Sequence, residues 1–361
     1  MSAEPIGPSV TSGLGECGWR DDLPAANAVQ SLAGRVARVV EQHRSGYKVT
    51  DGEYEFSVQS PSAWIKQSLM PDQRATVGDW VLLDPAHDRI EQLLPRQSLL
   101  RRAAAGEHYK QQLIAANIDT VLVVAGLDGD FNPRRLERYV AMVGASGAKP
   151  LIVLTKVDLD VQDADAALAE LTTLGVDVLR VNAREASARV CLQPWLSRGQ
   201  TLVLVGSSGA GKSTLTNTLL GHERQKTGSV RDSDSRGRHT TTHRSLVRLP
   251  DGACLIDTPG MRELKLTGEE DLEDAGFADI EALAGECKFR DCRHDREPGC
   301  AIRAALEAGD LDSSRWQQFQ KLGHELGAAR QSLAAQLERR AEDKRLNRAL
   351  NKRLVDKYGH R

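Results

Sequence analysis

The stretch GSSGAGKS, residues 206–213, decides how the centre of this chain is interpreted. It directly follows the apolar run TLVLV of residues 201–205 and precedes a helical stretch, residues 213–220, that Gly221 can end. Small residues after a buried strand let backbone N–H groups surround a phosphate, and the helix N-terminus adds partial positive charge. A chance glycine-rich turn is the alternative, but a strand and a helix stand on either side. The pattern therefore predicts the phosphate-binding loop of a nucleoside triphosphatase.

The phosphate site predicted from this loop includes a magnesium ion. Lys212 would reach the β- and γ-phosphates, and the Ser213 hydroxyl would bind Mg²⁺. The sequence DTPG, residues 257–260, follows another buried-looking strand; there Asp257 would hold Mg²⁺ through water and the N–H of Gly260 would meet the γ-phosphate. The nucleotide-binding residues predicted on the loop are Gly206, Ser207, Ser208, Gly209, Ala210, Gly211, Lys212, Ser213 and Thr214.

Two further segments predict that the base is guanine. The sequence TKVD, residues 155–158, ends a strand, so Asp158 would accept from the guanine N1–H and 2-amino group while the Lys156 stem lies over the base. Such a tetrapeptide alone is a weak signal, but beside a phosphate loop and DTPG it favours a base reader. Asn182 and Ala183 end the next strand, where a backbone N–H would reach guanine O6. The residues predicted to hold the base are Thr155, Lys156, Val157, Asp158, Asn182 and Ala183.

The order of these motifs along the chain is unusual. In most GTPases the phosphate loop precedes the base-reading element, whereas here residues 155–158 precede residues 206–213 and DTPG comes last. The same sheet can form after the chain ends are moved, because a site depends on geometry rather than on chain order. The motif order therefore predicts a circularly permuted GTPase.

Apolar runs and turns around these motifs predict the architecture. Strand-length runs at residues 120–125, 151–154, 176–181, 201–205 and 254–256 alternate with helical stretches, as in a parallel sheet covered by helices. One helix is expected to start at Asn132 as N-cap with Pro133 in the first position. Before residue 98, five short β-like runs (34–40, 46–50, 54–58, 79–83 and 89–94) suit a small barrel such as an OB-fold, although an SH3-like barrel would give much the same pattern.

The expected domains follow from these changes of pattern. Residues 1–31 are polar and are expected to form a flexible N-terminal tail. Residues 32–98 would form the barrel, 99–117 a polar basic linker, 118–271 the permuted GTPase domain, and 272–361 a zinc-binding helical domain that ends in a basic helix. Residues 337–361 contain nine Lys or Arg and four Asp or Glu, so this end of the chain is strongly basic.

Composition sets limits on location and class. The 361 residues are 40% hydrophobic and 27% charged with a formal net charge of −2, which is typical of soluble globular proteins and excludes an overall cationic coat. No run approaches the ~20 apolar residues of a membrane span, and the polar N-terminus does not resemble a signal peptide. Six cysteines in a chain of this length do not suggest a disulfide framework, so we expect a reducing cytoplasm.

Three of the six cysteines lie close together with one histidine. The pattern Cys287-x4-Cys292-x-His294-x5-Cys300 offers three thiolates and one imidazole, a complete tetrahedral set for Zn²⁺. A full set without an open position is typical of a structural zinc rather than a catalytic one. Three incidental thiols are the alternative interpretation.

Taken together, these motifs resemble one family. A small β-barrel, the permuted order TKVD, GSSGAGKS, GRHTTT (residues 237–242) and DTPG, and a C-terminal Cys/His cluster are similar to the bacterial ribosome small-subunit-dependent GTPase A, or YjeQ, family. The resemblance covers nearly everything after residue 32. It departs from the family at Thr155, where Asn is commoner, and at Asn182, where Ser is usual; we expect the first to cost some base affinity at most.

The resemblance implies a GTP-hydrolysing factor in late maturation of the small (30S) ribosomal subunit. It implies GTP and GDP as ligands, stimulation by the subunit, and contacts to rRNA from the barrel and the basic C-terminal helix. The GTP form would bind the subunit and hydrolysis would release it, with the protein acting as a monomer. Aromatic and basic side chains on a barrel suit irregular RNA, although Trp64 and Trp80 are individually more typical of a core.

A glycine- and charge-rich stretch, residues 224–244, resembles a switch that orders around GTP and Mg²⁺. A threonine there would complete the magnesium coordination; Thr241 is the first candidate and Thr240 the second. Met261 occupies the position where many GTPases place the glutamine that orients water, and a thioether cannot do this. His239 is therefore the candidate for positioning the attacking water, since an imidazole accepts hydrogen bonds near neutral pH.

Two rival functions remain open from the sequence. A metabolic ATP- or GTP-dependent enzyme would need a pocket for a small-molecule acceptor, of which the sequence shows no motif. A nonenzymatic RNA chaperone would use GTP for stability alone and would not hydrolyse it even with ribosomes present.

Overall fold

The computed structural model describes residues 13–29, 34–43, 46–65, 69–84, 88–103, 111–128, 131–159, 164–223, 244–258 and 277–313, and many positions of a helical segment between 315 and 345. The strands are β1 (Arg35–Gln42), β2 (Tyr47–Thr50), β3 (Glu55–Val58), β4 (Trp80–Leu83), β5 (Ile90–Leu93), β6 (Leu99–Ala103), β7 (Gln111–Ala116), β8 (Thr120–Gly126), β9 (Lys149–Thr155), β10 (Asp177–Arg180), β11 (Thr201–Val205), β12 (Ser245–Arg248) and β13 (Cys254–Asp257). The α-helices are α1 (Pro24–Val29), α2 (Pro133–Gly144), α3 (Ala164–Leu171), α4 (Ser187–Leu192), α5 (Lys212–Leu220), α6 (Ala278–Gly285) and α7 (Ala301–Ala308).

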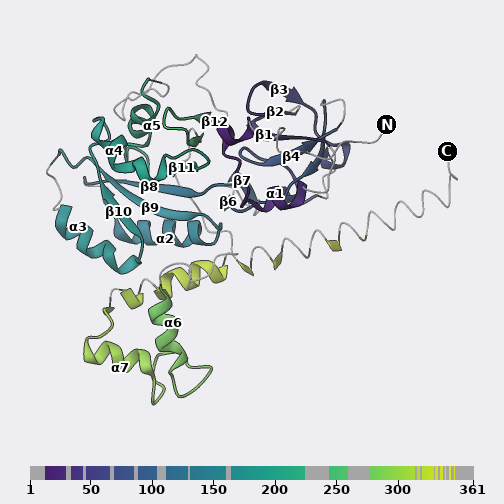
Figure 1. The fold of residues 1–361 in the computed structure, drawn as a ribbon. Helices are drawn as coiled ribbons and strands as arrows, with labels where there is room; N and C mark the ends of the chain where they lie inside the picture. Colours follow the sequence, from purple (N-terminus) through teal and green to yellow (C-terminus); the bar gives the residue numbers. More distant parts are fainter. Residues whose placement is uncertain are drawn as a thin grey trace, which may run out of the picture.

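The central domain is a mostly parallel sheet with helices on both faces (Figure 1). Its strand order is β10-β9-β8-β11-β13-β12, and β12 runs antiparallel to β13 while the other pairs are parallel. One core contains side chains of α2 and α3, and a second core on the other face contains side chains of α4 and α5. Strands β8, β9, β11 and β13 therefore contribute buried side chains to both cores, which explains their continuous apolar runs. The predicted central α/β domain is confirmed.

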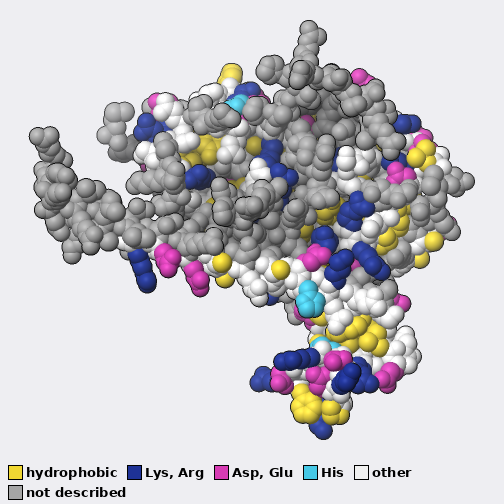
Figure 2. Space-filling view, turned by 180° about the vertical axis from the view of Figure 1, so that it is seen from behind, with side chains coloured by type: hydrophobic (Ala, Val, Ile, Leu, Met, Phe, Trp, Pro, Cys, Tyr) yellow, Lys and Arg dark blue, Asp and Glu magenta, His cyan; other side chains and the backbone are white. Residues whose placement is uncertain are grey.

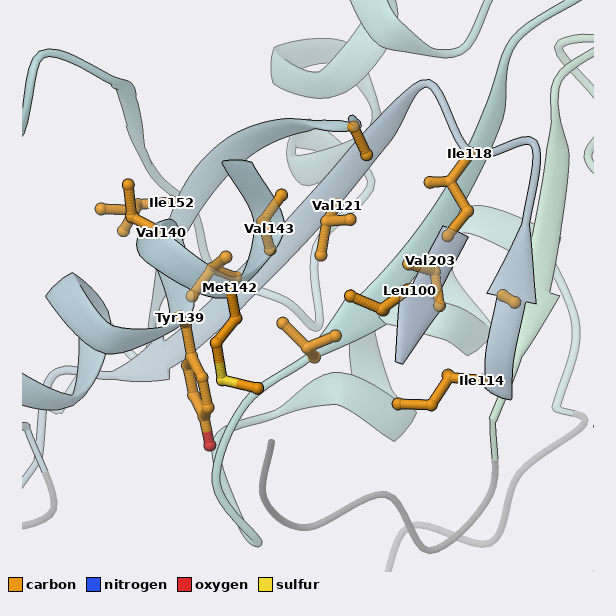
Figure 3. Packing of buried hydrophobic residues seen from close by; sticks show 14 of the residues in the cluster. Leu100, Ile114, Ile118, Val121, Tyr139, Val140, Met142, Val143, Ile152 and Val203 are labelled. Atoms are coloured by element: carbon orange, nitrogen blue, oxygen red, sulfur yellow. The ribbon is translucent and has the colours of Figure 1, made fainter. Parts of the chain in front are cut away.

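Helix α2 begins as the sequence predicts. The Asn132 side chain accepts a hydrogen bond from the Arg135 N–H at 3.1 Å, and Pro133 occupies the first turn. Figure 3 shows Tyr139, Val140 and Val143 of this helix among the side chains of the core beneath it. The cap and the apolar stripe together position α2 along the sheet.

Five strands at the N-terminal end form an antiparallel β-sheet that joins the central sheet where β1 pairs with β12. They pair antiparallel in the order β3-β2-β1-β4-β5, and an isolated parallel bridge between Gln59 and Arg89 brings the segments beyond β3 and before β5 together. The five strands expected from the turns are thus present within one or two residues of their expected ends. Among the aromatic residues of this region, Trp80 is fully buried and therefore belongs to the core, whereas Tyr54 is 68% exposed.

The expectation of a flexible tail at residues 1–31 is wrong for residues 13–29. Leu14, Cys17, Trp19 and Leu23 are buried against the β-rich part, and Trp19 meets Trp80 edge-to-face at 4.8 Å between ring centres. Leu14 and Cys17 lie in a 3-10 turn, and Trp19 and Leu23 lie between this turn and the short helix α1. Neither element is long enough to show the apolar repeat that identifies an amphipathic helix in a sequence. Residues 1–12 lie outside the described part of the chain.

Residues 99–117, expected to be a linker, contain an antiparallel β-ribbon. Strands β6 and β7 pair with each other, and Leu100 and Ile114 are buried in the core shared with α2 (Figure 3). The partly buried Arg101, Arg102 and Gln112 give this segment its polar composition, whereas residues 113–116 of β7 are all buried.

A buried arginine joins the N-terminal segment, the N-terminal β-sheet and the start of the central domain. The Arg38 guanidinium is fully buried and donates to the carbonyl oxygens of Cys17, Gly78 and Asn117. Nearby, Asp119 accepts a hydrogen bond from the Thr201 N–H at 2.7 Å and forms an ion pair with Arg20 at 2.9 Å. Asp119 thus connects the N-terminal segment to the first residue of β11. The phosphate-loop strand is therefore held directly against the N-terminal part.

The C-terminal module packs on α2. Its core includes residues of α6, α7 and the following helix, and Ala141 of α2 is buried in that core. The ion pair between Arg138 and Glu325 at 2.6 Å adds a second contact between the two parts. Among the helices in the described ranges, none combines the length and the apolar character needed to cross a membrane. Most of the expected basic helix at 337–361 lies outside the described residues.

Candidate nucleotide and metal sites

The segment predicted to bind phosphate forms a loop between β11 and α5. Gly206, Gly209 and Gly211 all have positive φ angles, of 143°, 81° and 95°, which side-chain-bearing residues rarely adopt. A Cβ on Gly206 would lie 2.1 Å from the carbonyl oxygen of Val124 in β8, so only glycine fits there. The loop therefore packs closely against β8, and its backbone leads directly into the N-terminus of α5.

Lys212 turns its ammonium back into this loop. Its Nζ donates to the carbonyl oxygens of Gly206 at 2.8 Å and Ser207 at 2.6 Å. Burial disfavours the charged form and lowers the pKa of Lys212 to about 8. A cation held by backbone carbonyls beside a helix N-terminus is arranged to receive an anion.

The segment predicted to read the base follows β9 as a tight turn. Lys156 has a φ of +60°, and its carbonyl oxygen accepts from the Leu159 N–H at 3.1 Å. This turn leaves Val157 and Asp158 exposed at the carboxyl end of the sheet. Ligands of open α/β sheets bind at this end of the strands.

Two hydroxyl groups connect the base-reading segments to the phosphate-binding segment. The buried Thr155 Oγ1 donates to the carbonyl oxygen of Ala210 in the loop at 2.6 Å. On the other side, Thr218 Oγ1 of α5 donates to the carbonyl oxygen of Ala183 at 2.6 Å. Segments predicted separately from the sequence are thus brought into one contiguous site. The Asn182 side chain is used locally, since its amide donates to Glu185 at 2.8 Å.

Of the residues predicted to complete the phosphate site, Asp257 lies within the described part of the chain. Asp257 is buried at the end of β13, next to β11 in the sheet. Gly260, Met261, Thr240, Thr241 and His239 lie outside the described residues. Their expected roles stay predictions.

Sequence reasoning missed one charged residue of this site. Asp128 lies two residues after β8, and its carboxylate pairs with the Lys156 ammonium. The signal was available, because an acidic side chain just past the carboxyl end of a buried parallel strand belongs to the edge where ligands bind.

The predicted zinc ligands come together in the C-terminal module. One donor atom from each of Cys287, Cys292, His294 and Cys300 lies within 4.8 Å of all the others. His294 Nδ1 is 3.5 Å from Sγ of both Cys287 and Cys300, and those two sulfurs are 3.9 Å apart.

The three separations among Cys287, His294 and Cys300 fit those around a tetrahedral zinc ion. Zn–S and Zn–N bonds of about 2.3 and 2.05 Å in a tetrahedron place sulfurs ~3.8 Å apart and sulfur and nitrogen ~3.6 Å apart. The Trp316 ring stands edge-on to the His294 ring at 5.4 Å and belongs to the module's core. The ligand set is therefore supported by packing that orients the imidazole.

Known proteins are similar to this chain over most of its length. The family model described as RsgA GTPase matches residues 93–267. A relative from Xylella fastidiosa (strain M23), named small ribosomal subunit biogenesis GTPase RsgA, is 58% identical over 319 residues, covering 86% of this chain and 95% of the relative. A relative of the same name from Xanthomonas axonopodis pv. citri is 57% identical and covers 83% of each chain. The chain belongs to the RsgA GTPase family.

Solved structures agree with this membership. The crystal structure of YjeQ from Thermotoga maritima is 25% identical, covers 81% of this chain and 98% of that one, and has a TM-score of 0.57. YloQ, a circularly permuted GTPase, has a TM-score of 0.56 at 23% identity and shows the same fold. A second model, described as ABC transporter, matches residues 192–350, which also contain the phosphate-loop sequence. The RsgA relatives, which cover most of the chain, decide in favour of the first model.

Proposed function

We propose that this RsgA-family GTPase hydrolyses GTP in the late maturation of the small (30S) ribosomal subunit. The observation that carries the proposal is the bond from Thr155 to the carbonyl of Ala210, which joins the predicted guanine reader to the predicted phosphate loop in one site. The names of the relatives, which cover 83% and 86% of the chain, supply the biological process.

The proposed nucleotide contacts follow from the placement of each segment. Residues 206–214 hold the phosphates, with Lys212 on the β- and γ-phosphates. Asp158 accepts from the guanine edge, and the N–H of Ala183 donates to O6. The exposure of Asp158 at the edge of the sheet supports its availability to a base.

Magnesium would be held by Ser213 and a switch threonine, Thr241 before Thr240, with Asp257 acting through water. When bound, this ion neutralises charge that develops on the phosphates. Gly260 would donate its N–H to the γ-phosphate, and His239 would orient the attacking water. The burial of Asp257 beside the phosphate-loop strand supports its part in this arrangement.

Zinc is proposed as a structural ion held by Cys287, Cys292, His294 and Cys300. The fit of the separations among Cys287, His294 and Cys300 to tetrahedral geometry, with Cys292 in the same cluster, supports this assignment. The ion would stabilise a module whose position on α2 is maintained by Ala141 and by the Arg138–Glu325 ion pair.

Contacts with rRNA are proposed for the N-terminal barrel, as an OB-fold, and for the basic C-terminal helix. The pairing order of β1 to β5 supports the OB-fold assignment. The C-terminal module adds exposed Lys and Arg side chains (Figure 2), and Lys288 Nζ lies 5.6 Å from the ring centre of exposed Phe289. Cations with an accessible ring suit RNA phosphates and bases.

The proposed cycle couples nucleotide state to docking. The GTP form binds the subunit, and hydrolysis stimulated by the subunit releases it, in the cytoplasm and as a monomer. Because Met261 cannot orient water, the isolated protein is expected to hydrolyse GTP slowly until the docked subunit orders the site.

The test is single-turnover GTP hydrolysis with and without purified small subunits. The parent should be strongly stimulated, and His239→Ala should lose about 10²-fold of the stimulated rate while keeping GTP-dependent subunit binding. His222→Ala is the matched control, because His222 is an exposed histidine at the end of α5. Equal stimulation of parent and His239→Ala would remove His239 from the mechanism. Fast turnover without subunits would favour a metabolic enzyme, and binding without turnover would favour a chaperone.

A further inference from the structure

An ion pair lies where the candidate guanine site meets the strand next to it. Strands β8 and β9 are parallel with Gly126 opposite Thr155, so both strands end at the same level of the sheet. The Leu127 N–H donates to the carbonyl oxygen of Thr155 at 2.9 Å and keeps the ends of the two strands side by side. Asp128 lies two residues after β8 and Lys156 directly after β9, and their side chains form an ion pair.

The pair determines the direction of the Lys156 side chain. Lys156 has the left-handed φ of +60° that is uncommon for a residue with a side chain. A Cβ on Gly126 would lie 3.1 Å from Lys156 Cδ, 3.2 Å from its Cε and 3.1 Å from Asp128 Oδ1. The lysine stem therefore crosses over the Gly126 backbone and ends at the carboxylate of Asp128. A glycine at this position leaves room for both side chains.

We propose that Asp128 is a positioning residue of the guanine site. By pairing with the Lys156 ammonium, Asp128 fixes the lysine stem in the place where the stem packs against the face of the base. This inference rests on the proposed nucleotide function and names a residue that determines base affinity. An unpaired lysine samples many rotamers, and ordering such a side chain has a considerable entropic cost. With the ammonium already paired, much of that ordering precedes nucleotide binding.

The exposure of the pair suits this role. Both side chains are about a quarter exposed, 28% for Lys156 and 25% for Asp128, so water and the base have access to the stem. The ion pair is also separate from the phosphate contacts, because Lys212 supplies the cation of the loop. Loss of Asp128 should therefore weaken every ligand that stacks on Lys156 without changing how the base edge is read.

The experiment measures GDP affinity of the full chain by titration with a fluorescent GDP analogue. Asp128→Asn should weaken binding about three- to fivefold, the size expected of a partly exposed ion pair. Lys156→Met keeps an apolar stem without the ammonium, so adding Asp128→Asn to it should change nothing further. Asp251→Asn is the matched control: it removes the Arg189–Asp251 pair, whose exposures are 33% and 24%, and should leave GDP affinity unchanged.

Xanthine nucleotides separate this inference from the proposed function. In the Asp158→Asn background, which should prefer xanthosine diphosphate, Asp128→Asn should again cause the same fold-loss, because the stem contacts the face of the base. Unchanged or tighter GDP binding by Asp128→Asn overturns the inference, as does an undiminished loss in the Lys156→Met background. If the parent shows no preference for GDP over ADP, the proposed guanine site itself is refuted and the inference with it.

Discussion

The ammonium of Lys212 gives the most direct test of the phosphate site through pH. Burial lowers its pKa to about 8, and its two acceptors are loop carbonyls rather than a carboxylate. A bound polyphosphate supplies the missing negative charge and returns the pKa to a higher value. Binding above pH 8 is therefore expected to take up a proton.

The expected size follows from this pKa. The free protein must protonate Lys212 before it binds well, so the apparent affinity falls by the factor 1 + 10^(pH − 8). Between about pH 7 and about pH 8.5 this gives a roughly fourfold loss of GDP affinity, with about half a proton taken up at pH 8. The range stops there because guanine begins to lose its own N1 proton at higher pH.

Folding stability should respond to Lys212 in the opposite direction. Its pKa is lower in the folded protein than the ordinary value of 10.5, so between about pH 8 and 10.5 the unfolded chain binds more protons. The contribution of Lys212 to stability of the nucleotide-free protein therefore rises with pH over the range in which GDP affinity falls.

The assay is calorimetric titration with GDP in two buffers of different ionisation enthalpy, repeated across the pH range. Lys212→Arg is the control, because an arginine stays charged and should remove the pH dependence whatever its overall affinity. Groups on GDP that titrate in this range contribute equally to both proteins. A parent that takes up no proton at pH 8, or an arginine variant with the same pH profile, would refute the assignment of Lys212.

Two further predictions concern the link within the site and the metal. Thr155→Val keeps the shape but removes the donor to Ala210, and should lower the free energy of unfolding by about 1–3 kcal/mol and weaken GDP binding, while Thr155→Ser should retain both. Thermal unfolding and GDP titration measure this, and a valine variant equal to the parent would contradict it. Cys292→Ser should reduce zinc content and subunit binding with nucleotide affinity unchanged, whereas stoichiometric zinc in a Cys287/Cys292 double variant would contradict the ligand set.

Strands of the central sheet were predictable because local signals agree with the global fold there. A buried parallel strand must be apolar on both faces, so runs such as residues 201–205 stand out without any knowledge of their neighbours. The start of α2 was predictable for a similar reason, since the Asn132 cap acts on a residue only three positions away. The N-terminal segment was not, because Leu14 and Trp19 are ordered by partners far along the chain.

The sequence by itself determined the permuted order of motifs, the alternation of strand and helix, and the Cys/His cluster, since each is a pattern of residue types at short spacing. Only the tertiary structure decided that Thr155 bonds to Ala210, 55 residues away, that Asp128 pairs with Lys156, 28 residues away, and that Arg38 joins three segments. Contacts of this kind depend on which strands become neighbours and at what register. Pairing between strands is set by packing of the whole core, which short spacings along the chain do not encode.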